Sequence, residues 1–246
     1  MSKDTVYQQP QAAIGNFQFD DTVARVFPDM IGRSVPGYGL MVDMIGVLAE
    51  RHVLPHTTCY DLGSSLGACS FAMAQNIAVP DCQIIGIDNS AAMIERAKIL
   101  QQEHPVTTPI EFVQQDILDL TFAPSSMVVM NFTLQFIARD QRDALLSRIY
   151  QALVPNGILV LSEKLQFADP AQDQELFDMH HAFKRAQGYS ALEIAQKRTA
   201  LENVLLPDTP DVHVARLKQA GFAEAMLWFQ CFNFASFVAI KREESR

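Results

Sequence analysis

The sequence predicts an α/β fold, a doubly wound and mostly parallel sheet of seven strands that ends in an antiparallel hairpin. Three observations predict it. Between residues 59 and 162, short apolar runs that end in polar residues alternate with helix-like segments. A glycine-containing turn, Asp61-Leu-Gly-Ser-Ser-Leu-Gly67, joins the first run to the first helix. Two aromatic-rich runs lie close together near the C-terminus. Such alternation implies parallel strands with helices on both faces of the sheet.

The N-terminal part is predicted to precede this sheet. Residues 1–15 are polar, and we expect them to be disordered or loosely attached. Residues 20–53 have the pattern of helices, and we expect these helices to be interrupted at Pro28 and at several glycines. The last of these helices is predicted over 39–54. We interpret residues 1–55 as a helical segment that forms a lid, with Tyr38 in the turn-rich linker before the last helix.

The next five strands follow from apolar runs, and their helices follow from turn and capping residues. The strands are predicted at 59–62, 83–88, 110–113, 126–131 and 158–162. The helices are predicted at 68–76, after a cap at Asn89 or Ser90, and after a cap at Asp140, with a turn at 155–157 before the fifth strand.

The C-terminal third begins with an interruption of the alternation. Residues 164–205 are charged and helical in pattern, and we interpret them as an insertion over the active edge of the sheet. Thr209-Pro210 begins one more helix, which ends at Gly221. The runs 224–230 and 234–241 predict the terminal hairpin, followed by a charged tail. Because no interdomain linker is evident, we expect one domain over residues 1–246.

Composition excludes several classes of protein. The net charge of −9 argues against a polybasic surface that binds nucleic acid directly. No apolar run is long enough to span a membrane, and the N-terminus lacks a signal-peptide core. The four cysteines form no C-x-x-C pair and are expected to be buried, reduced thiols. We therefore expect a cytoplasmic protein.

The candidate site residues lie where the predicted strands end. Gly63, with Ser64 and Ser65, forms the first turn, which brings backbone N–H groups and a helix N-terminus to a polar ligand. Asp61 lies at the lip of the turn, and a serine replaces a glycine of the dinucleotide pattern, which disfavours pyrophosphate. An ordinary strand-to-helix turn is the alternative interpretation.

The next strand ends carry two acids and an amide. Asp88 lies 25 residues after Gly63, close to the spacing of an acid that accepts hydrogen bonds from both ribose hydroxyls. Asp116 with Ile117 could hold an adenine edge, and Asn131 could reach the amino-acid part of an adenosyl ligand. Each residue alone could equally be a helix cap. Together, at successive strand ends, they predict an adenosyl-ligand site.

Other chemistry has less support. His180-His181 matches no metal-ligand spacing, so we predict surface histidines and no metal site. Ser162-Glu163 ends the fifth strand, and its acid is interpreted either as a catalytic group or as a solvent-exposed side chain. The absence of a G-x-S-x-G elbow leaves hydrolase chemistry unsupported.

Several motifs give the sequence a closer resemblance. The motifs are Asp61-Leu-Gly-Ser-Ser-Leu-Gly67, Gly86-Ile-Asp-Asn-Ser90, Asn131-Phe-Thr-Leu-Gln-Phe136, Leu161-Ser-Glu-Lys164, Gln196-Lys-Arg-Thr-Ala-Leu-Glu-Asn-Val-Leu205, Phe27-Pro-Asp-Met30 and Ser34-Val-Pro-Gly-Tyr38. With these motifs, the sequence from Cys59 to Lys241 resembles the class I S-adenosylmethionine-dependent methyltransferases, and almost the whole chain is similar to the carboxy-S-adenosyl-L-methionine synthase family.

The resemblance implies a reaction and its site. S-adenosyl-L-methionine and prephenate would become carboxy-S-adenosyl-L-methionine and phenylpyruvate through a sulfonium ylide that captures carbon dioxide. Arg198 would bind the new carboxylate, although by pattern alone it belongs to a solvated helix face. The cofactor site would comprise Tyr38, Gly63, Ser64, Ser65, Asp88, Asn89, Asp116, Ile117, Asn131 and Arg198.

The resemblance also implies partners. The protein would be a homodimer with a subunit contact in the insertion, and a tRNA uridine carboxymethyltransferase would use the product to modify a wobble uridine. Two alternatives remain open at this point. One is an ordinary methyltransferase that acts on a small acidic acceptor, and the other is a non-enzymatic adenosylmethionine-binding regulatory protein.

Overall fold

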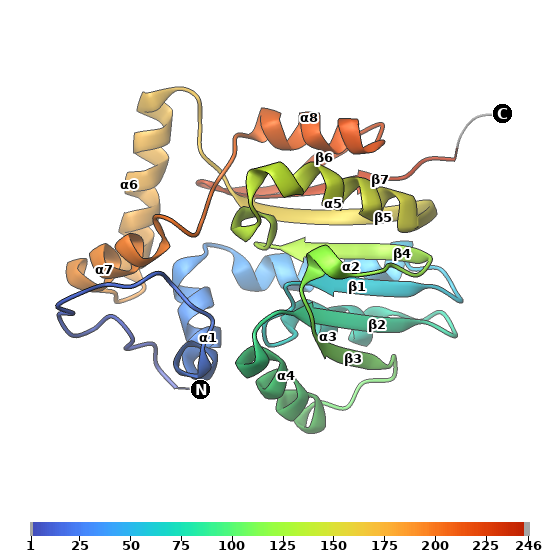
Figure 1. The fold of residues 1–246 in the computed structure, drawn as a ribbon, viewed down its shortest axis with the longest axis horizontal. Coiled ribbons are helices and arrows are strands. Elements are labelled where there is room, and N and C mark those ends of the chain that lie inside the picture. Colours follow the sequence, from blue (N-terminus) through green and yellow to red (C-terminus); the bar gives the residue numbers. More distant parts are fainter. Residues whose placement is uncertain (1, 244–246) are drawn as a thin grey trace.

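A seven-stranded sheet is the centre of the computed structural model, which describes residues 2–243 (Figure 1). The strand order is β3-β2-β1-β4-β5-β7-β6, and β7 is antiparallel to both of its neighbours while the other neighbouring pairs are parallel. The strands are β1 (Thr58–Leu62), β2 (Gln83–Asp88), β3 (Ile110–Gln114), β4 (Ser125–Asn131), β5 (Leu153–Lys164), β6 (Ala225–Cys231) and β7 (Phe234–Ile240). The predicted doubly wound fold class is confirmed.

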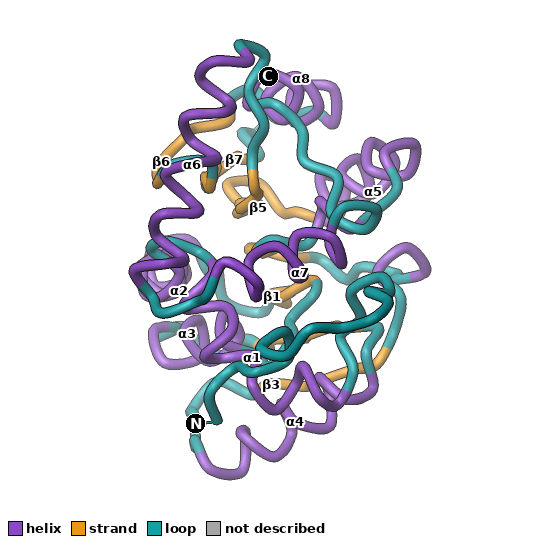
Figure 2. The backbone as a smooth tube through the Cα atoms, turned by 90° about the vertical axis from the view of Figure 1, so that its left-hand side faces the viewer, coloured by secondary structure: helices purple, strands orange, loops and turns teal. Residues whose placement is uncertain are grey.

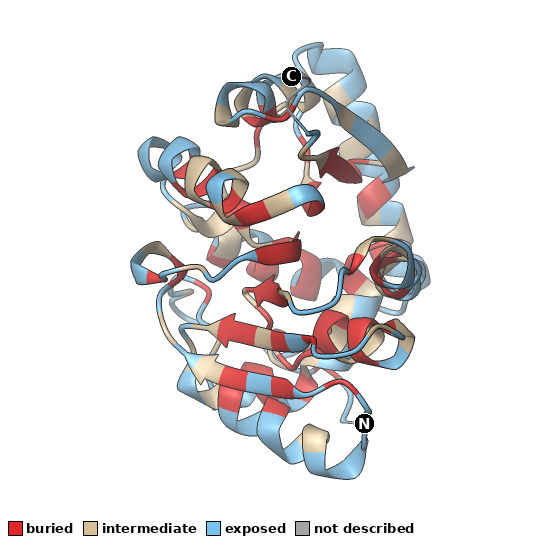
Figure 3. Ribbon diagram, turned by 90° about the vertical axis from the view of Figure 1, so that its right-hand side faces the viewer, coloured by how far each residue is buried: buried red, intermediate tan, exposed pale blue. Residues whose placement is uncertain are grey.

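Helices cover both faces of the sheet because the central strands are apolar on both sides. Val128 and Leu159 face a core shared with α5 (Arg139–Ala152) and α8 (Pro210–Ala220). Val129 and Val160 face the opposite core, shared with α2 (Tyr38–His52) and α3 (Ala68–Asn76). The central strands and the inner helix faces are therefore buried, whereas the edge strand β6 and the outer helix faces are largely exposed (Figure 3). Helix α4 (Ala91–Glu103) packs along β2 and β3.

The predicted helical insertion forms two helices at one edge of the sheet. α6 (Pro170–Ala186) begins after its cap Asp169, and α7 (Ala191–Leu201) begins at a capping box of Ser190 and Glu193. Both helices lie at the carboxyl ends of the parallel strands, and α7 crosses in front of them (Figure 2). Short 3-10 turns, η1 (Ile117–Asp119) and η2 (Leu134–Phe136), follow β3 and β4 at the same edge.

Three local predictions were wrong. α1 (Asp21–Ser34) continues through Pro28, because proline removes only one backbone donor while buried residues such as Val26 and Met30 anchor both sides of it. Asp140 does not cap α5; the cap is Ala138, and Asp140 lies in the first turn, where a carboxylate suits the helix dipole. The turn at 155–157 lies within β5, where the pairing with β4 shifts register.

The N-terminal arm is also not loosely attached over its described residues. Asp4 is buried, and its backbone N–H donates to Asp29 Oδ2 at 2.7 Å. Gln196 Nε2 donates to the carbonyls of Tyr7 and Gln9, both at 2.9 Å. The arm therefore fastens α1 to α7, since its polar groups find partners far along the chain. Met1 and the end of the predicted charged tail, residues 244–246, lie outside the described residues.

Within residues 2–243, none of the helices has the length and hydrophobicity needed to cross a membrane.

Candidate functional site

The turn after β1 is built around Gly63. Its φ is +75°, and a Cβ there would approach Thr133 Oγ1 to 2.4 Å. The backbone N–H groups of Gly63 and Ser64 both donate to the carbonyl of Ile87, at 2.8 and 2.9 Å. Thr133 Oγ1 donates to the carbonyl of Leu62 at 2.7 Å. Three strand ends are thereby held in contact, which brings the predicted site residues to one edge of the sheet.

Replacing Gly63 with alanine is expected to lower the free energy of unfolding by about 1–3 kcal/mol, because the left-handed backbone and the contact with Thr133 both oppose a side chain. Gly15→Ala is the matched control, since no atom lies within 4 Å of its Cβ position. That control is expected to change stability by less than about 0.5 kcal/mol. Urea unfolding measures both; equal effects would show that the turn is not constrained as described.

Asp61 is buried beneath the turn and holds the start of α3. Its Oδ2 accepts from the backbone N–H of Ser70 at 3.0 Å and from Ser70 Oγ at 2.7 Å. Burial raises the pKa of Asp61 to about 6, and the nearby charge of Asp88 adds to the rise. Because both hydrogen bonds are buried, Asp61 has a structural role and supports the turn.

Asp88 ends β2 directly beside the turn. Its Oδ2 accepts from the backbone N–H of Ser65 at 2.9 Å, and its Oδ1 accepts from that of Ser90 at 2.9 Å. Burial raises its pKa. Each carboxylate oxygen keeps a further lone pair that can accept from a hydroxyl. The arrangement suits the predicted ribose contact, with Asn89 exposed next to it.

Tyr38 and Asn131 approach the turn from α2 and β4. The pKa of Tyr38 is raised well above its usual value by burial first, then by the nearby Cys69 and Asp61. Two polar atoms at this rim, Asn131 Oδ1 and Ser64 Oγ, are buried without a hydrogen-bond partner among the described residues. Because an unpaired buried polar atom costs stability, these two atoms favour a polar ligand here.

Asp116 and Ile117 follow β3 at the same edge. Asp116 is exposed, and its Oδ1 accepts from the backbone N–H of Leu118 at 2.9 Å, so this oxygen caps η1. Ile117 is buried beside it. The helix-cap interpretation therefore accounts for one carboxylate oxygen.

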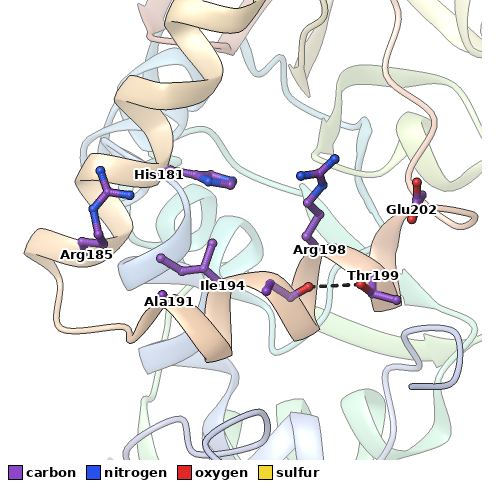
Figure 4. A pocket seen from close by; sticks show the side chains of 8 residues that line it. His181, Arg185, Ala191, Ile194, Arg198, Thr199 and Glu202 are labelled. Atoms are coloured by element: carbon purple, nitrogen blue, oxygen red, sulfur yellow. Dashed lines mark hydrogen bonds between the residues drawn. The ribbon is translucent and has the colours of Figure 1, made fainter. Parts of the chain in front are cut away.

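Arg198 lies on α7 and lines an open pocket of about 390 Å³ between α6 and α7. Its guanidinium lies 5.2 Å from the ring centre of Phe177. Arg198 and His181 point into the space between the helices, and Glu202 lines the pocket further along α7 (Figure 4). Among the residues described, Arg198 makes no ion pair or hydrogen bond, so its donors are available to a ligand.

His180 is not the surface histidine that the sequence predicted. It is 6% exposed, its Nε2 lies 2.8 Å from the carbonyl of Ser34, and its ring packs on Phe234 at 4.8 Å. Burial and neighbouring lysines lower its pKa to about 3. The sequence around His180-His181 did not indicate this packing. Across residues 2–243, no group of three or more His, Cys, Asp and Glu side chains could hold a metal ion.

Glu163, at the end of β5, is buried, so the interpretation as a solvent-exposed acid was wrong. Its Oε1 accepts from the backbone N–H of Leu134 at 3.0 Å. Burial raises its pKa to about 8, although Arg142 opposes the rise. The sequence did not indicate that η2 covers this end of β5 and so buries Glu163.

Glu163 is expected to make stability fall with rising pH. Below its ordinary pKa of 4.5 the group is protonated in both states; between 4.5 and about 8 only the unfolded chain loses the proton, so the folded state is progressively penalised. Each pKa unit corresponds to about 1.4 kcal/mol. Glu163→Gln should therefore gain stability relative to wild type between pH 5 and pH 8 in urea unfolding. An unchanged difference would contradict the raised pKa.

The comparisons with known proteins agree with the methyltransferase fold. A methyltransferase-domain family model matches residues 60–157. The fold resembles magnesium protoporphyrin IX methyltransferase from Synechocystis, solved with S-adenosylhomocysteine (TM-score 0.60, 18% identity, 86% of each chain). It also resembles human N-acetylserotonin methyltransferase, solved with S-adenosylmethionine (TM-score 0.60, 17% identity, 91% of this chain and 56% of that one).

Closer relatives match almost the whole chain. Carboxy-S-adenosyl-L-methionine synthase from Klebsiella pneumoniae is 54% identical over 98% of both chains. The protein of the same name from Citrobacter koseri is 55% identical over 97% of both chains. The chain therefore belongs to the carboxy-S-adenosyl-L-methionine synthase family of transferases.

Proposed function

We propose that this enzyme converts S-adenosyl-L-methionine and prephenate into carboxy-S-adenosyl-L-methionine and phenylpyruvate. The observation that carries the proposal is Arg198: a guanidinium that forms no ion pair within residues 2–243, in a pocket beside the carboxyl ends of the strands. A planar guanidinium is the side chain best suited to bind a carboxylate in two places. An ordinary methyltransferase gains little from it, because a cation near the methyl repels the sulfonium.

The proposed reaction is balanced without another reagent. In the prephenate dianion, the bond between the ring carbon and its carboxylate breaks, and the ring loses its hydroxyl group as hydroxide. The products of this step are phenylpyruvate, carbon dioxide and OH⁻. Hydroxide removes a proton from the sulfonium methyl and becomes water. The ylide carbon then forms a bond to carbon dioxide, which leaves a carboxylate on the former methyl group.

The chain's residues would bind and orient the reactants. Asp88 would accept from the ribose hydroxyls, and the unpaired Asn131 Oδ1 and Ser64 Oγ would receive polar groups of the ligand. Tyr38 would close the site from α2. Helix α7, fastened by the N-terminal arm, would cover the site, exclude water and keep carbon dioxide from escaping.

We further propose the biological setting. The protein would act in the cytoplasm as a single-domain homodimer, and a tRNA uridine carboxymethyltransferase would use its product for the wobble uridine. Supporting the subunit contact, Met179 on α6 and Leu192 on α7 are each 40% exposed. Exposed apolar side chains on neighbouring helices favour a protein contact.

The mass of the small molecule released from freshly purified, denatured protein tests the proposal. Adenosylmethionine plus one carbon dioxide is expected. Plain adenosylmethionine, combined with methyl transfer to an acidic acceptor and no reaction with prephenate, would favour the methyltransferase. Ligand binding without turnover on any donor would favour a regulatory protein.

A further inference from the structure

Three lysine side chains gather where α6 and α7 meet the end of β5. Lys184 is 6% exposed and Lys197 is 7% exposed. Their ammonium groups lie 5.8 and 5.9 Å from the ring centre of Tyr189, which places both near the same aromatic ring. Lys164 is the last residue of β5, and its charge acts on Lys184 and on His180.

The positive charge of this group is poorly compensated. In the part of the chain that the structure describes, none of the three lysines forms an ion pair; Lys197 Nζ donates to Ser34 Oγ at 3.0 Å. The acids whose charge acts on this group are Asp4, which already accepts from the Tyr189 hydroxyl, and Asp173, which acts on Lys164. Burial followed by like charges lowers the pKa of Lys184 to about 8 and that of Lys197 to about 7.

A buried charge without a counter-charge is costly, and a bound ligand of opposite charge would offset that cost. The same location also holds an unpaired acceptor. His180 Nε2 lies 2.8 Å from the Ser34 carbonyl and must donate to it, so Nδ1 carries a lone pair. That Nδ1 is buried without a partner among the described residues, and the charges of Lys164 and Lys184 both act on the ring. Ammonium donors and one neutral acceptor suit an anion that also carries a hydroxyl.

The lysine group adjoins the adenosyl site. Phe132, which follows Asn131, packs on Phe234 at 5.9 Å, and Phe234 packs on His180 at 4.8 Å. Ser34, the partner of Lys197, precedes Tyr38 by one short linker. The charge of Arg198 acts on both Lys164 and His181. A molecule held by the lysines would therefore lie close to both the adenosyl site and Arg198.

We infer that Lys164, Lys184, Lys197 and His180 bind the carboxyl donor: the ammonium groups hold its two carboxylates, and His180 Nδ1 accepts from its hydroxyl. The inference deepens the proposed function and rests on it. A dianion would compensate this group far better than a monoanion, so the site would favour the dicarboxylate donor over the monocarboxylate that remains after the reaction. Product release would follow from the loss of one charge.

The test uses Lys184→Met and Lys197→Met, which keep most of the side-chain volume and remove the charge. Lys218→Met, at an exposed lysine on α8, is the matched control. Prephenate is titrated into each protein by calorimetry after loading with S-adenosylhomocysteine, which cannot react. We expect prephenate to bind at least about tenfold more weakly to both variants, since each loses a charged hydrogen bond.

Three further readouts separate binding from folding. The KM for prephenate is expected to rise by a similar factor while the KM for adenosylmethionine changes by less than about twofold. Both variants are expected to melt no lower than wild type, because an uncompensated buried charge has been removed. Phenylpyruvate is expected to bind wild type more weakly than prephenate does. Its affinity is also expected to fall less in the two variants than the affinity for prephenate.

The outcomes distinguish the two proposals. If wild type makes carboxylated product and both variants bind prephenate as tightly as wild type, the lysine site is wrong and the proposed function stands. If wild type makes no product and binds no prephenate, the proposed function is wrong and the lysine site falls with it.

Discussion

Arg198→Ala is expected to leave adenosylmethionine binding within about threefold of wild type and to lower the yield of carboxylated product by at least about a hundredfold. The reason is that the guanidinium forms no ion pair or hydrogen bond within the described residues, so the carboxylate that the proposed reaction creates would be its partner. Loss of a charged, bidentate contact of this kind typically costs about 2–4 kcal/mol in the reacting complex. Calorimetry with adenosylmethionine and quantitative mass spectrometry of product, free and bound, measure the two effects.

Arg185→Ala is the matched control for Arg198. Arg185 lines the same pocket from α6, so its removal changes the local charge by the same amount. The control is expected to retain most of the product yield. Equal losses of adenosylmethionine binding and product in the Arg198 variant, or equal losses in both arginine variants, would contradict the specific role of Arg198.

Asp88→Ala is expected to weaken adenosylmethionine binding by roughly ten- to 150-fold, which corresponds to about 1.5–3 kcal/mol for a hydrogen bond to a charged group. The carboxylate lies beside the turn, already oriented by Ser65 and Ser90. Asp88→Asn keeps one carbonyl acceptor and is expected to fall between wild type and alanine. Calorimetry measures all three proteins.

Asp43→Ala provides the comparison for Asp88, because Asp43 is an exposed carboxylate on α2. Its removal tests whether a general loss of negative charge affects binding. Unchanged affinity in Asp88→Ala would remove this residue from the site, and a matching loss in Asp43→Ala would attribute the effect to overall charge.

The strand ends were predictable because parallel strands bury apolar runs and release polar residues at one edge. Asp61, Asp88 and Asn131 each end an apolar run, and the observed strands end at or within one residue of them. The bounds of α3 and β2 match the prediction at both ends. Local capping also succeeded where one residue determines it, as at Ser90.

The remaining errors arose where distant segments decide the outcome. The polar arm resembled a disordered tail because its partner, Gln196, lies far along the chain. His180 and Lys197 lie in charged, helix-like sequence, and their burial depends on the crossing of α1, α6 and α7. Pairing across such distances leaves no periodic signal in the sequence, so these residues could not be placed without the structure.

Transfer of an isotopic label from prephenate to the nucleoside product tests the proposed reaction. Prephenate carrying ¹³C in the ring carboxylate is incubated with the enzyme and unlabelled adenosylmethionine, and the nucleoside product is analysed by mass spectrometry. The account predicts adenosylmethionine plus one labelled carbon dioxide, with phenylpyruvate in equal amount. Carboxylated product without the label, or no carboxylated product while adenosylmethionine binds normally, would contradict the transfer of carbon dioxide from prephenate.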